Sequence, residues 1–371
     1  MYLVQGEPLA IGKPRGEFNR VTFAAAHVVA DAFTGSDPSG SPAIDWDKTL
    51  AYRNYLLDLG FGIAEAMDTS QRGMGLDWAK AFELIGHSLK SAGKRSSQIY
   101  SGCGTDQLPA SEARSLDDVI RAYLEQLHAI QKLDGRIILM ASRALVKVAR
   151  SPDDYLKVYA RVLAEADHPV ILHWLGEMFD PSLKGYWGSG AFEPAMETCL
   201  AAIDASVSKV DGIKVSLLDD QKEIAMRRRL PVGIKMYTGD DFNYPDLIAG
   251  DDQGYSHALL GIFDAIAPAA SGALSALAKG NMKKYTKLMA PTVPLSRLIF
   301  RAPTQYYKTG IVFLAWLNGH QNHFVMISGA QAMRPLPYFI DIFKLADQAG
   351  LLADPDLAVK RMKKLLTLYG A

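Results

Sequence analysis

The chain has 371 residues, 49% of them hydrophobic, which is enough to bury a complete core in one large domain or in two. Lysine plus arginine and aspartate plus glutamate both count 40, so the formal charge is zero and no nucleic-acid or membrane partner is indicated. No apolar run approaches the ~18 residues of a membrane helix. With no recognisable export signal and only two cysteines, the sequence predicts a cytoplasmic protein that binds a small molecule.

Short β-branched runs alternate along the chain with longer segments in which apolar residues recur every three or four positions. This alternation is typical of β-α units that build a parallel sheet. The runs predicted to be strands are 21–29, 62–68, 98–102, 136–141, 169–174, 210–216, 231–238 and 258–266. Eight β-α units predict an α/β fold of the (β/α)8 TIM barrel type, which typically needs ~250 residues.

The helices between these runs have recognisable starts. Asp45 is a predicted N-cap, and Pro152 lies in the predicted first turn of another helix. After residue 281 no strand pattern recurs, and the remaining amphipathic segments are predicted helices: 282–290, 294–301, 304–318, 334–349 and 354–369. The sequence therefore predicts a barrel domain over 1–280 and a C-terminal helical region over 281–371.

Two lysines are the first candidates for chemistry, because Gly-Ile-Lys occurs on both the sixth and the seventh predicted strand, at Lys214 and Lys235. Catalytic groups in such barrels lie at the carboxyl ends of the strands. Desolvation lowers the pKa of a buried lysine, so that its neutral amine can attack a carbonyl and form a Schiff base. Lys214 lies nearer the end of its strand. The alternation of side chains leaves open which lysine faces inward, and a structural role at the rim remains open for both.

Other polar residues allow different chemistry. A divalent cation bound by Asp68, His173 and Asp240 would be an alternative electrophile, since hard cations prefer carboxylate oxygens. His320 and His323 could share a helical face as metal ligands, although histidines are also favoured at a helix C-terminus. No Gly-x-Gly-x-x-Gly follows a predicted strand, so the sequence predicts no nucleotide cofactor, and we predict no resident metal. Cys103 is predicted to pack in the interior.

Five motifs occur in a recognisable order: IDWDKTLAYRNYLLDLGFGIAEAMDTSQ, HPVILHW, VDGIKVS, YTGDD and FDAIAP. Over residues 44 to 290 this order resembles the dihydrodipicolinate synthase and N-acetylneuraminate lyase family, the pyruvate-type class I aldolases and hydro-lyases. The resemblance implies a (β/α)8 barrel, a homo-oligomer, and an imine between a 2-oxo acid and the lysine of the first Gly-Ile-Lys. That lysine is Lys214, which leaves Lys235 as the structural one.

The sequence departs from the family at several positions. His173 stands where the family has a proton-transferring tyrosine, and a histidine with an ordinary pKa of about 6.5 can transfer protons near neutrality. Gly176-Glu177-Met178 replaces a segment in which the family has an arginine. The Thr-Thr-Gly-Glu turn has become Asp68-Thr69-Ser70-Gln71, whose hydroxyl groups can still hold a carboxylate although Asp68 opposes an anion. The substrate-binding residues predicted in this way are Asp68, Thr69, Ser70, Tyr237, Gly239 and Asp240.

The sequence and the resemblance together predict a lyase that acts on pyruvate or an extended 2-oxo acid through a Schiff base at Lys214, with His173 moving protons. Two alternatives from other classes remain. One is a metal-dependent TIM-barrel lyase or isomerase. The other is a non-catalytic barrel that binds an oxo acid. Loops decide the substrate in this fold, so the sequence does not name the aldehyde partner.

Overall fold

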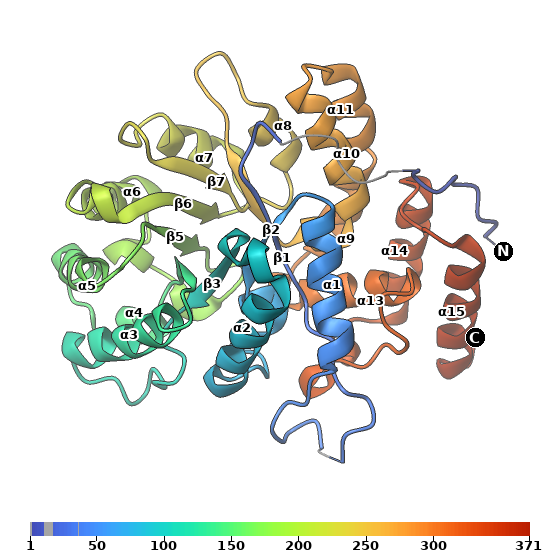
Figure 1. Ribbon diagram of the computed structural model, residues 1–371, viewed down its shortest axis with the longest axis horizontal. Helices are drawn as coiled ribbons and strands as arrows, with labels where there is room; N and C mark the ends of the chain where they lie inside the picture. The colour runs from blue at the N-terminus through green and yellow to red at the C-terminus, as the bar shows by residue number, and fades with distance from the viewer. Residues whose placement is uncertain (1, 11–17, 36) are drawn as a thin grey trace. The chain divides into compact units, whose positions relative to one another are not determined.

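The computed structural model describes residues 2–10, 18–35 and 37–371. The N-terminal stretch 1–17, for which the sequence predicts no export signal, therefore lies partly outside the described residues. Within the described ranges eight parallel strands close into a barrel in chain order, which confirms the predicted (β/α)8 fold (Figure 1). The strands are β1 (Thr22–Ala25), β2 (Gly62–Glu65), β3 (Ile99–Cys103), β4 (Arg136–Leu139), β5 (Val170–Leu175), β6 (Val210–Ser216), β7 (Lys235–Thr238) and β8 (His257–Leu260).

Helices follow the strands as the β-α alternation predicts. Asp45 caps α1 by accepting a hydrogen bond from the backbone N–H of Lys48, and Pro152 is the first residue of α5. The barrel helices are α1 (Trp46–Asp58), α2 (Trp78–Ala92), α3 (Leu116–Gln131), α4 (Arg143–Val148), α5 (Pro152–Ala164), α6 (Phe192–Asp204), α7 (Asp220–Arg227), α8 (Tyr244–Ala249), α9 (Ile262–Ala265) and α10 (Ala267–Ala278).

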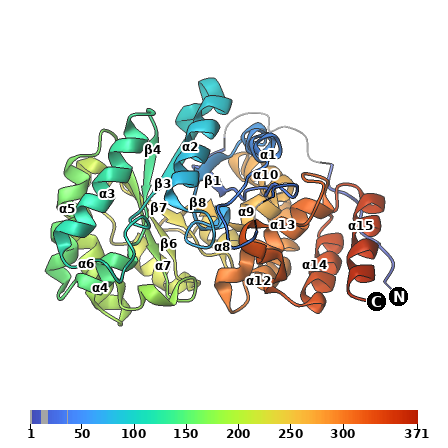
Figure 2. The same ribbon diagram turned by 90° about the horizontal axis from the view of Figure 1, so that it is seen from below.

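The C-terminal region is helical, as predicted. Its helices are α11 (Met282–Met289), α12 (Thr292–Ile299), α13 (Tyr307–Leu317), α14 (Leu336–Gln348) and α15 (Pro355–Leu368). Helices α13, α14 and α15 lie side by side and contact one another (Figure 2). Helix α13 is buried over its whole length, which its almost entirely apolar sequence requires. No helix in the described residues is both long and apolar enough to cross a membrane.

The chain forms two compact units, which are described separately. The first comprises residues 1–63, 68–76 and 260–371, and the second comprises residues 64–67 and 77–259. The second unit contains β3 to β7, with helices α3, α5 and α6 outside the strands (Figure 1). The predicted division near residue 280 stays a prediction.

Five strands are shorter in the structure than the predicted runs 21–29, 62–68, 136–141, 231–238 and 258–266, and three of them differ most. Strand β1 ends at Ala25, because the next backbone groups are bound by side chains: the N–H of His27 donates to Asp264 at 2.8 Å. Strand β7 begins only at Lys235, because residues 231–234 form a turn in which Ile234 N–H donates to Pro231 O and Gly233 has a φ of 90°. Strand β8 ends at Leu260, where Gly261 starts the short helix α9.

Candidate active site on β5, β6 and β7

Lys214 is the fifth residue of β6, and only 6% of its surface is exposed. His173 of β5 is its cross-strand partner in register, so the two side chains lie on the same face of the barrel wall. Ser216, two residues further along β6, shares that face, and its hydroxyl lies 3.2 Å from Nε2 of His173. The second unit therefore brings Lys214, His173 and Ser216 together at the carboxyl ends of two neighbouring strands, where this fold carries its chemistry.

His173 is held in its neutral form. Burial, and next the positive charge of Lys214, lower the pKa of His173 well below its ordinary value of 6.5. The sequence suggested an ordinary titration near neutrality, and the structure corrects this, because an imidazole buried beside an ammonium group resists protonation. A neutral imidazole has one ring nitrogen that accepts a proton and one that donates, so His173 is in the form that a general base requires.

Gly239, which follows β7, packs closely against the side chain of Lys214. A Cβ atom at this position would lie 2.2 Å from the Ser216 hydroxyl oxygen and 2.8 Å from Cε of Lys214. Its own N–H donates to Val215 O at 2.8 Å, which fixes the backbone in place. Only glycine lets the chain approach Lys214 and Ser216 this closely.

Lys235 has different surroundings. Its ammonium lies 2.6 Å from one carboxylate oxygen of Asp211, and the Tyr237 hydroxyl donates to the other at 2.6 Å. Lys235 is the first residue of β7, and its side chain is 34% exposed. Asp211 lies at an irregularity in the pairing of β5 with β6, because Val170 pairs with Val210 whereas Ile171 pairs with Gly212. Lys235 and Tyr237 therefore both bind Asp211, the second residue of β6.

Asp240 stabilises the turn after β7. One carboxylate oxygen accepts from the backbone N–H groups of Phe242 and Asn243 at 2.8 and 3.0 Å, and the other accepts from the Asn243 side chain at 2.9 Å. Burial raises the pKa of Asp240, and these hydrogen bonds oppose the rise. This turn holds Gly239 beside Lys214. Substrate contacts by Tyr237, Gly239 and Asp240 stay predictions.

The predicted carboxylate-binding turn lies in the first unit, as a short helical turn over Asp68–Ser70. Thr69 and Ser70 are both buried. The Thr69 hydroxyl is 2.8 Å from the Tyr307 hydroxyl of α13, and Ser70 donates to Ala26 O at 2.7 Å. Tyr307 is fixed in turn by stacking on Phe300, with ring centres 4.3 Å apart. The predicted role of Asp68, Thr69 and Ser70 in substrate binding stays a prediction.

The other candidate residues have ordinary structural contacts. In the described part of the chain no three His, Cys, Asp or Glu side chains are grouped so that they could hold a metal ion. His320 packs against the rings of Tyr52 and Tyr55, and burial lowers the pKa of His320 to about 4. Cys103 is fully buried, with its sulfur 3.6 Å from Tyr123 O, which fits the packing role predicted for it.

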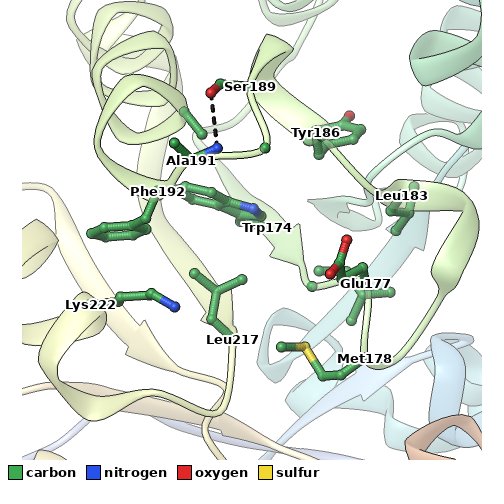
Figure 3. Close-up of a pocket in the computed structure, with 15 residues that line it drawn as sticks. Trp174, Glu177, Met178, Leu183, Tyr186, Ser189, Ala191, Phe192, Leu217 and Lys222 are labelled. Atoms are coloured by element: carbon green, nitrogen blue, oxygen red, sulfur yellow. Dashed lines mark hydrogen bonds between the residues drawn. The ribbon is translucent and has the colours of Figure 1, made fainter.

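A pocket of about 170 Å³ lies beyond the carboxyl ends of β5 and β6, and we call it the β5–α6 pocket (Figure 3). Its walls come from the loop over residues 176–191, the first turns of α6 and α7, and the residues that directly follow His173 and Ser216. Trp174 and Phe192 stack with ring centres 5.7 Å apart on one side. The labelled lining residues are Trp174, Glu177, Met178, Leu183, Tyr186, Ser189, Ala191, Phe192, Leu217 and Lys222.

Reasoning from the sequence missed two features of this site. Ser216 could have been found from the two-residue period of a strand, because it stands two positions after Lys214 and ends β6. The aromatic pocket had no comparable signal, since its rings come from β5, from the irregular loop after it and from α6. Residues so far apart in sequence meet only after the loop has folded.

Comparisons with known proteins agree with this fold. A prophage protein of the dihydrodipicolinic acid synthase family from E. coli K12, solved in complex with pyruvate, aligns with a TM-score of 0.70 and 13% identity over 90% of this chain and 99% of that one. Dihydrodipicolinate synthase from Bacillus anthracis gives 0.64 and 18% over 88% and 98%, and that from Thermotoga maritima 0.65 and 14% over 91% and 100%. At such low identities these matches establish the fold.

Comparison of the sequence with curated proteins and with family models gives a second result. No curated protein matches the chain. One family model, described as a protein of unknown function (DUF993), matches residues 1–371, and the chain therefore belongs to the DUF993 family.

Proposed function

We propose that the protein is a class I lyase that binds a 2-oxo acid, pyruvate or an extended analogue, as a Schiff base on Lys214. The observation that carries this proposal is the buried Lys214, in register with a neutral His173 at the carboxyl end of the barrel. The nucleophile that a ketone requires is the neutral form of this amine, so the Lys214 ammonium must lose a proton before it adds to the substrate. The fold neighbour solved with pyruvate adds support, because its barrel binds a ligand of this class.

The reaction proceeds in balanced steps. The Lys214 amine adds to the C2 carbonyl to form a carbinolamine, whose hydroxyl group takes up a proton and leaves as water to give the protonated imine. In the cleavage direction a C4 hydroxyl loses its proton to a base. The C3–C4 bond then breaks, its electron pair moves toward the imine nitrogen, and an aldehyde leaves. Protonation of the resulting enamine at C3 and hydrolysis of the imine release pyruvate and restore the amine.

His173 is the proposed base in this sequence. It is neutral, it lies beside the lysine, and its Nε2 atom is 3.2 Å from the Ser216 hydroxyl, which can pass a proton between the imidazole and a bound ligand. Gly239 leaves the space that the lysine side chain occupies. Lys235 takes no part in the chemistry, because Asp211 holds its ammonium.

The direct test is reduction with borohydride in the presence of pyruvate and a panel of 2-oxo acids, followed by peptide mass spectrometry. We expect one reduced adduct on Lys214 in the wild-type protein and in Lys235→Arg. We expect none in Lys214→Arg, which keeps the positive charge and cannot form the imine. An adduct on Lys235, or no adduct with any 2-oxo acid, would overturn the proposal.

A further inference from the structure

A buried carboxylate in the first unit has one oxygen without a partner. Asp264 of α9 binds His27, just beyond β1, through its oxygen Oδ2, which accepts from the backbone N–H of His27 at 2.8 Å and lies 2.8 Å from ring atom Nδ1. Both side chains are completely buried. The second carboxylate oxygen, Oδ1, and the second ring nitrogen, Nε2, are buried too, and neither has a hydrogen-bond partner among the described residues.

The positions of Asp264 and His27 are fixed by their neighbours. The Tyr52 hydroxyl of α1 donates to Asp264 O at 2.7 Å, and the Tyr52 ring packs on the His27 ring with centres 4.5 Å apart. Arg53 donates to His27 O at 2.5 Å. Helix α9 packs against both β1 and α13. A buried acceptor without a donor is destabilising, so a carboxylate held this firmly indicates a ligand at Oδ1.

A cavity of about 30 Å³ lies beside Asp264, and we call it the Asp264 cavity. A water-sized particle needs roughly 10–15 Å³ of such space, so the cavity holds one small ion or molecule. Asp264 is the one acidic residue in the described lining. His27 does not belong to the lining, so the oxygen turned away from it, Oδ1, lies on the cavity side. Tyr55 in the lining is half-buried and Ala353 is exposed, which leaves a way in from solvent.

The charge beside the Asp264 cavity is negative. Among the described residues His27 is the only ion-pair partner of Asp264, and a proton on Nε2 of His27 would find no acceptor there. Burial, and next the negative charge of Asp264, raise the pKa of Tyr55 to about 12. Burial lowers the pKa of His320 to about 4, so this lining residue is neutral at pH 7. A cation in the cavity would balance the buried carboxylate.

The lining suits a monovalent cation better than a divalent one. A divalent ion takes about six oxygen ligands. The cavity offers Asp264, the Tyr55 hydroxyl and the Asn318 side chain, whose oxygen already accepts from a backbone N–H at 2.9 Å. The rings of Tyr52, Tyr55 and His320 belong to the same wall, with centres 4.7 to 5.5 Å apart. Aromatic rings attract ammonium groups, and a carboxylate adds the opposite charge.

We propose that the Asp264 cavity binds one small monovalent cation of the ammonium class, with the Asp264 carboxylate as its counter-charge. Potassium has the same charge and a similar size, and the test separates the two ions. The bound ion joins α1, α9 and the residues that follow α13 within the first unit. The proposal does not depend on the proposed function, because no step of it involves Lys214.

The first test locates the ion in the wild-type protein. Crystals are equilibrated with rubidium chloride, whose cation is close to ammonium in size, and the rubidium is found by its anomalous scattering. We expect one peak in the Asp264 cavity, beside Oδ1. Ammonium chloride and potassium chloride should both displace it, and the salt that does so at the lower concentration identifies the preferred ion. A water molecule and no rubidium in the cavity would overturn the proposal.

The second test measures stability. Replacing choline chloride by ammonium chloride at constant ionic strength should raise the midpoint of thermal unfolding by about 2 °C, because only the folded chain has the site and choline is too large for it. Asp264→Asn keeps an oxygen that can accept from His27 but removes the charge, and it should abolish this increase. Asp252→Asn, at an exposed position, is the matched control and should keep it. An equal increase in wild type and Asp264→Asn would contradict the role of the carboxylate.

A third variant tests the space if Asp264→Asn does not fold. Ala353 lines the cavity and is exposed, so Ala353→Leu can fill the space without touching the bond between Asp264 and His27. This variant should lose both the rubidium peak and the ammonium-dependent increase, whereas Ala353→Ser, which is nearly the same size as alanine, should keep them. An unchanged rubidium peak in Ala353→Leu would exclude this cavity as the site.

Discussion

His173 and Lys214 face each other in register on β5 and β6, and the positive charge of Lys214 adds to burial in lowering the pKa of His173. This lowered pKa has a specific consequence for the pH dependence of the reaction rate. The imidazole stays neutral until the pH falls well below 6.5, so proton transfer through His173 gives no change of rate near pH 6.5.

We therefore expect turnover by the wild-type protein to stay flat through pH 6.5 and to decline only at lower pH. His173→Asn should reduce turnover by about 100-fold, the usual contribution of one general base, while the adduct on Lys214 still forms. The measurements are pH–rate profiles with the best substrate of the panel and trapping yields in parallel. An acidic limb at pH 6.5 that disappears in His173→Asn would contradict the assigned protonation state.

The same shift makes stability depend on pH. The unfolded chain takes up a proton on this histidine below pH 6.5, whereas the folded chain does so only at lower pH. The contribution of His173 to the free energy of unfolding is therefore complete above pH 6.5 and is lost as the pH falls. Urea unfolding of wild type and His173→Asn between pH 7 and 5 should show a steeper loss in the wild type.

Gly239→Ala tests whether close backbone packing positions the lysine. The new methyl group would meet Ser216 Oγ at 2.2 Å, Val215 O at 2.7 Å and Lys214 Cε at 2.8 Å, so the lysine side chain or the turn must shift. We expect the trapping rate to fall at least tenfold, with the circular dichroism spectrum unchanged. Gly35→Ala, where a Cβ meets nothing within 4 Å, should behave as wild type. Equal trapping rates in both variants would exclude this role for Gly239.

Lys235→Ala should affect stability and not chemistry. The ion pair with Asp211 is partly exposed, at 34% and 19% for the two side chains, so its removal should lower the free energy of unfolding by about 1 kcal/mol. Trapping on Lys214 should continue at the wild-type rate. Lys235→Arg keeps a positive charge beside Asp211 and is the matched variant, with a smaller loss of stability in urea titration.

The sequence predicted the barrel well where the pattern is local. The limits of β6 were predicted without error, because VDGIKVS is a β-branched run that ends at turn residues. The seventh and eighth runs were too long, because Pro231-Val-Gly-Ile and Gly261-Ile-Phe are apolar but form a turn and a helix start. An apolar run therefore does not by itself indicate a strand, and it does not always indicate burial, since Val232 is exposed.

The candidate site was also predictable only where it depends on a local pattern in the sequence. The position of Lys214 near the end of its strand could be read from the pattern of that strand alone. The physical difference between Lys214 and Lys235 could not, because it depends on the contact of Lys235 with Asp211 on the neighbouring strand. The register that places His173 opposite Lys214 depends on an irregularity at Val170 and Ile171, which no periodicity in the sequence indicates. The low pKa of His173 likewise depends on tertiary burial.

The last prediction concerns Glu223 of α7, whose carboxyl group is buried away from water. Ser256 donates to one of its oxygens at 2.7 Å, but burial dominates and raises the pKa of Glu223 from 4.5 to about 8. Between these two values the folded chain holds a proton that the unfolded chain has released. The contribution of Glu223 to the free energy of unfolding should therefore fall as the pH rises from 4.5 to 8, by up to about 1.4 kcal/mol per pH unit.

Glu223→Gln should remove this dependence, because the amide keeps an oxygen that accepts from Ser256 and has no proton to lose. We expect the variant to match the wild type near pH 4.5 and to be more stable at pH 8, in urea unfolding followed by tryptophan fluorescence. Glu112→Gln, at an exposed position, is the control and should follow the wild type at every pH. If Glu223→Gln is instead less stable than the wild type at pH 8, Glu223 is ionised in the folded protein and its carboxylate is stabilised there.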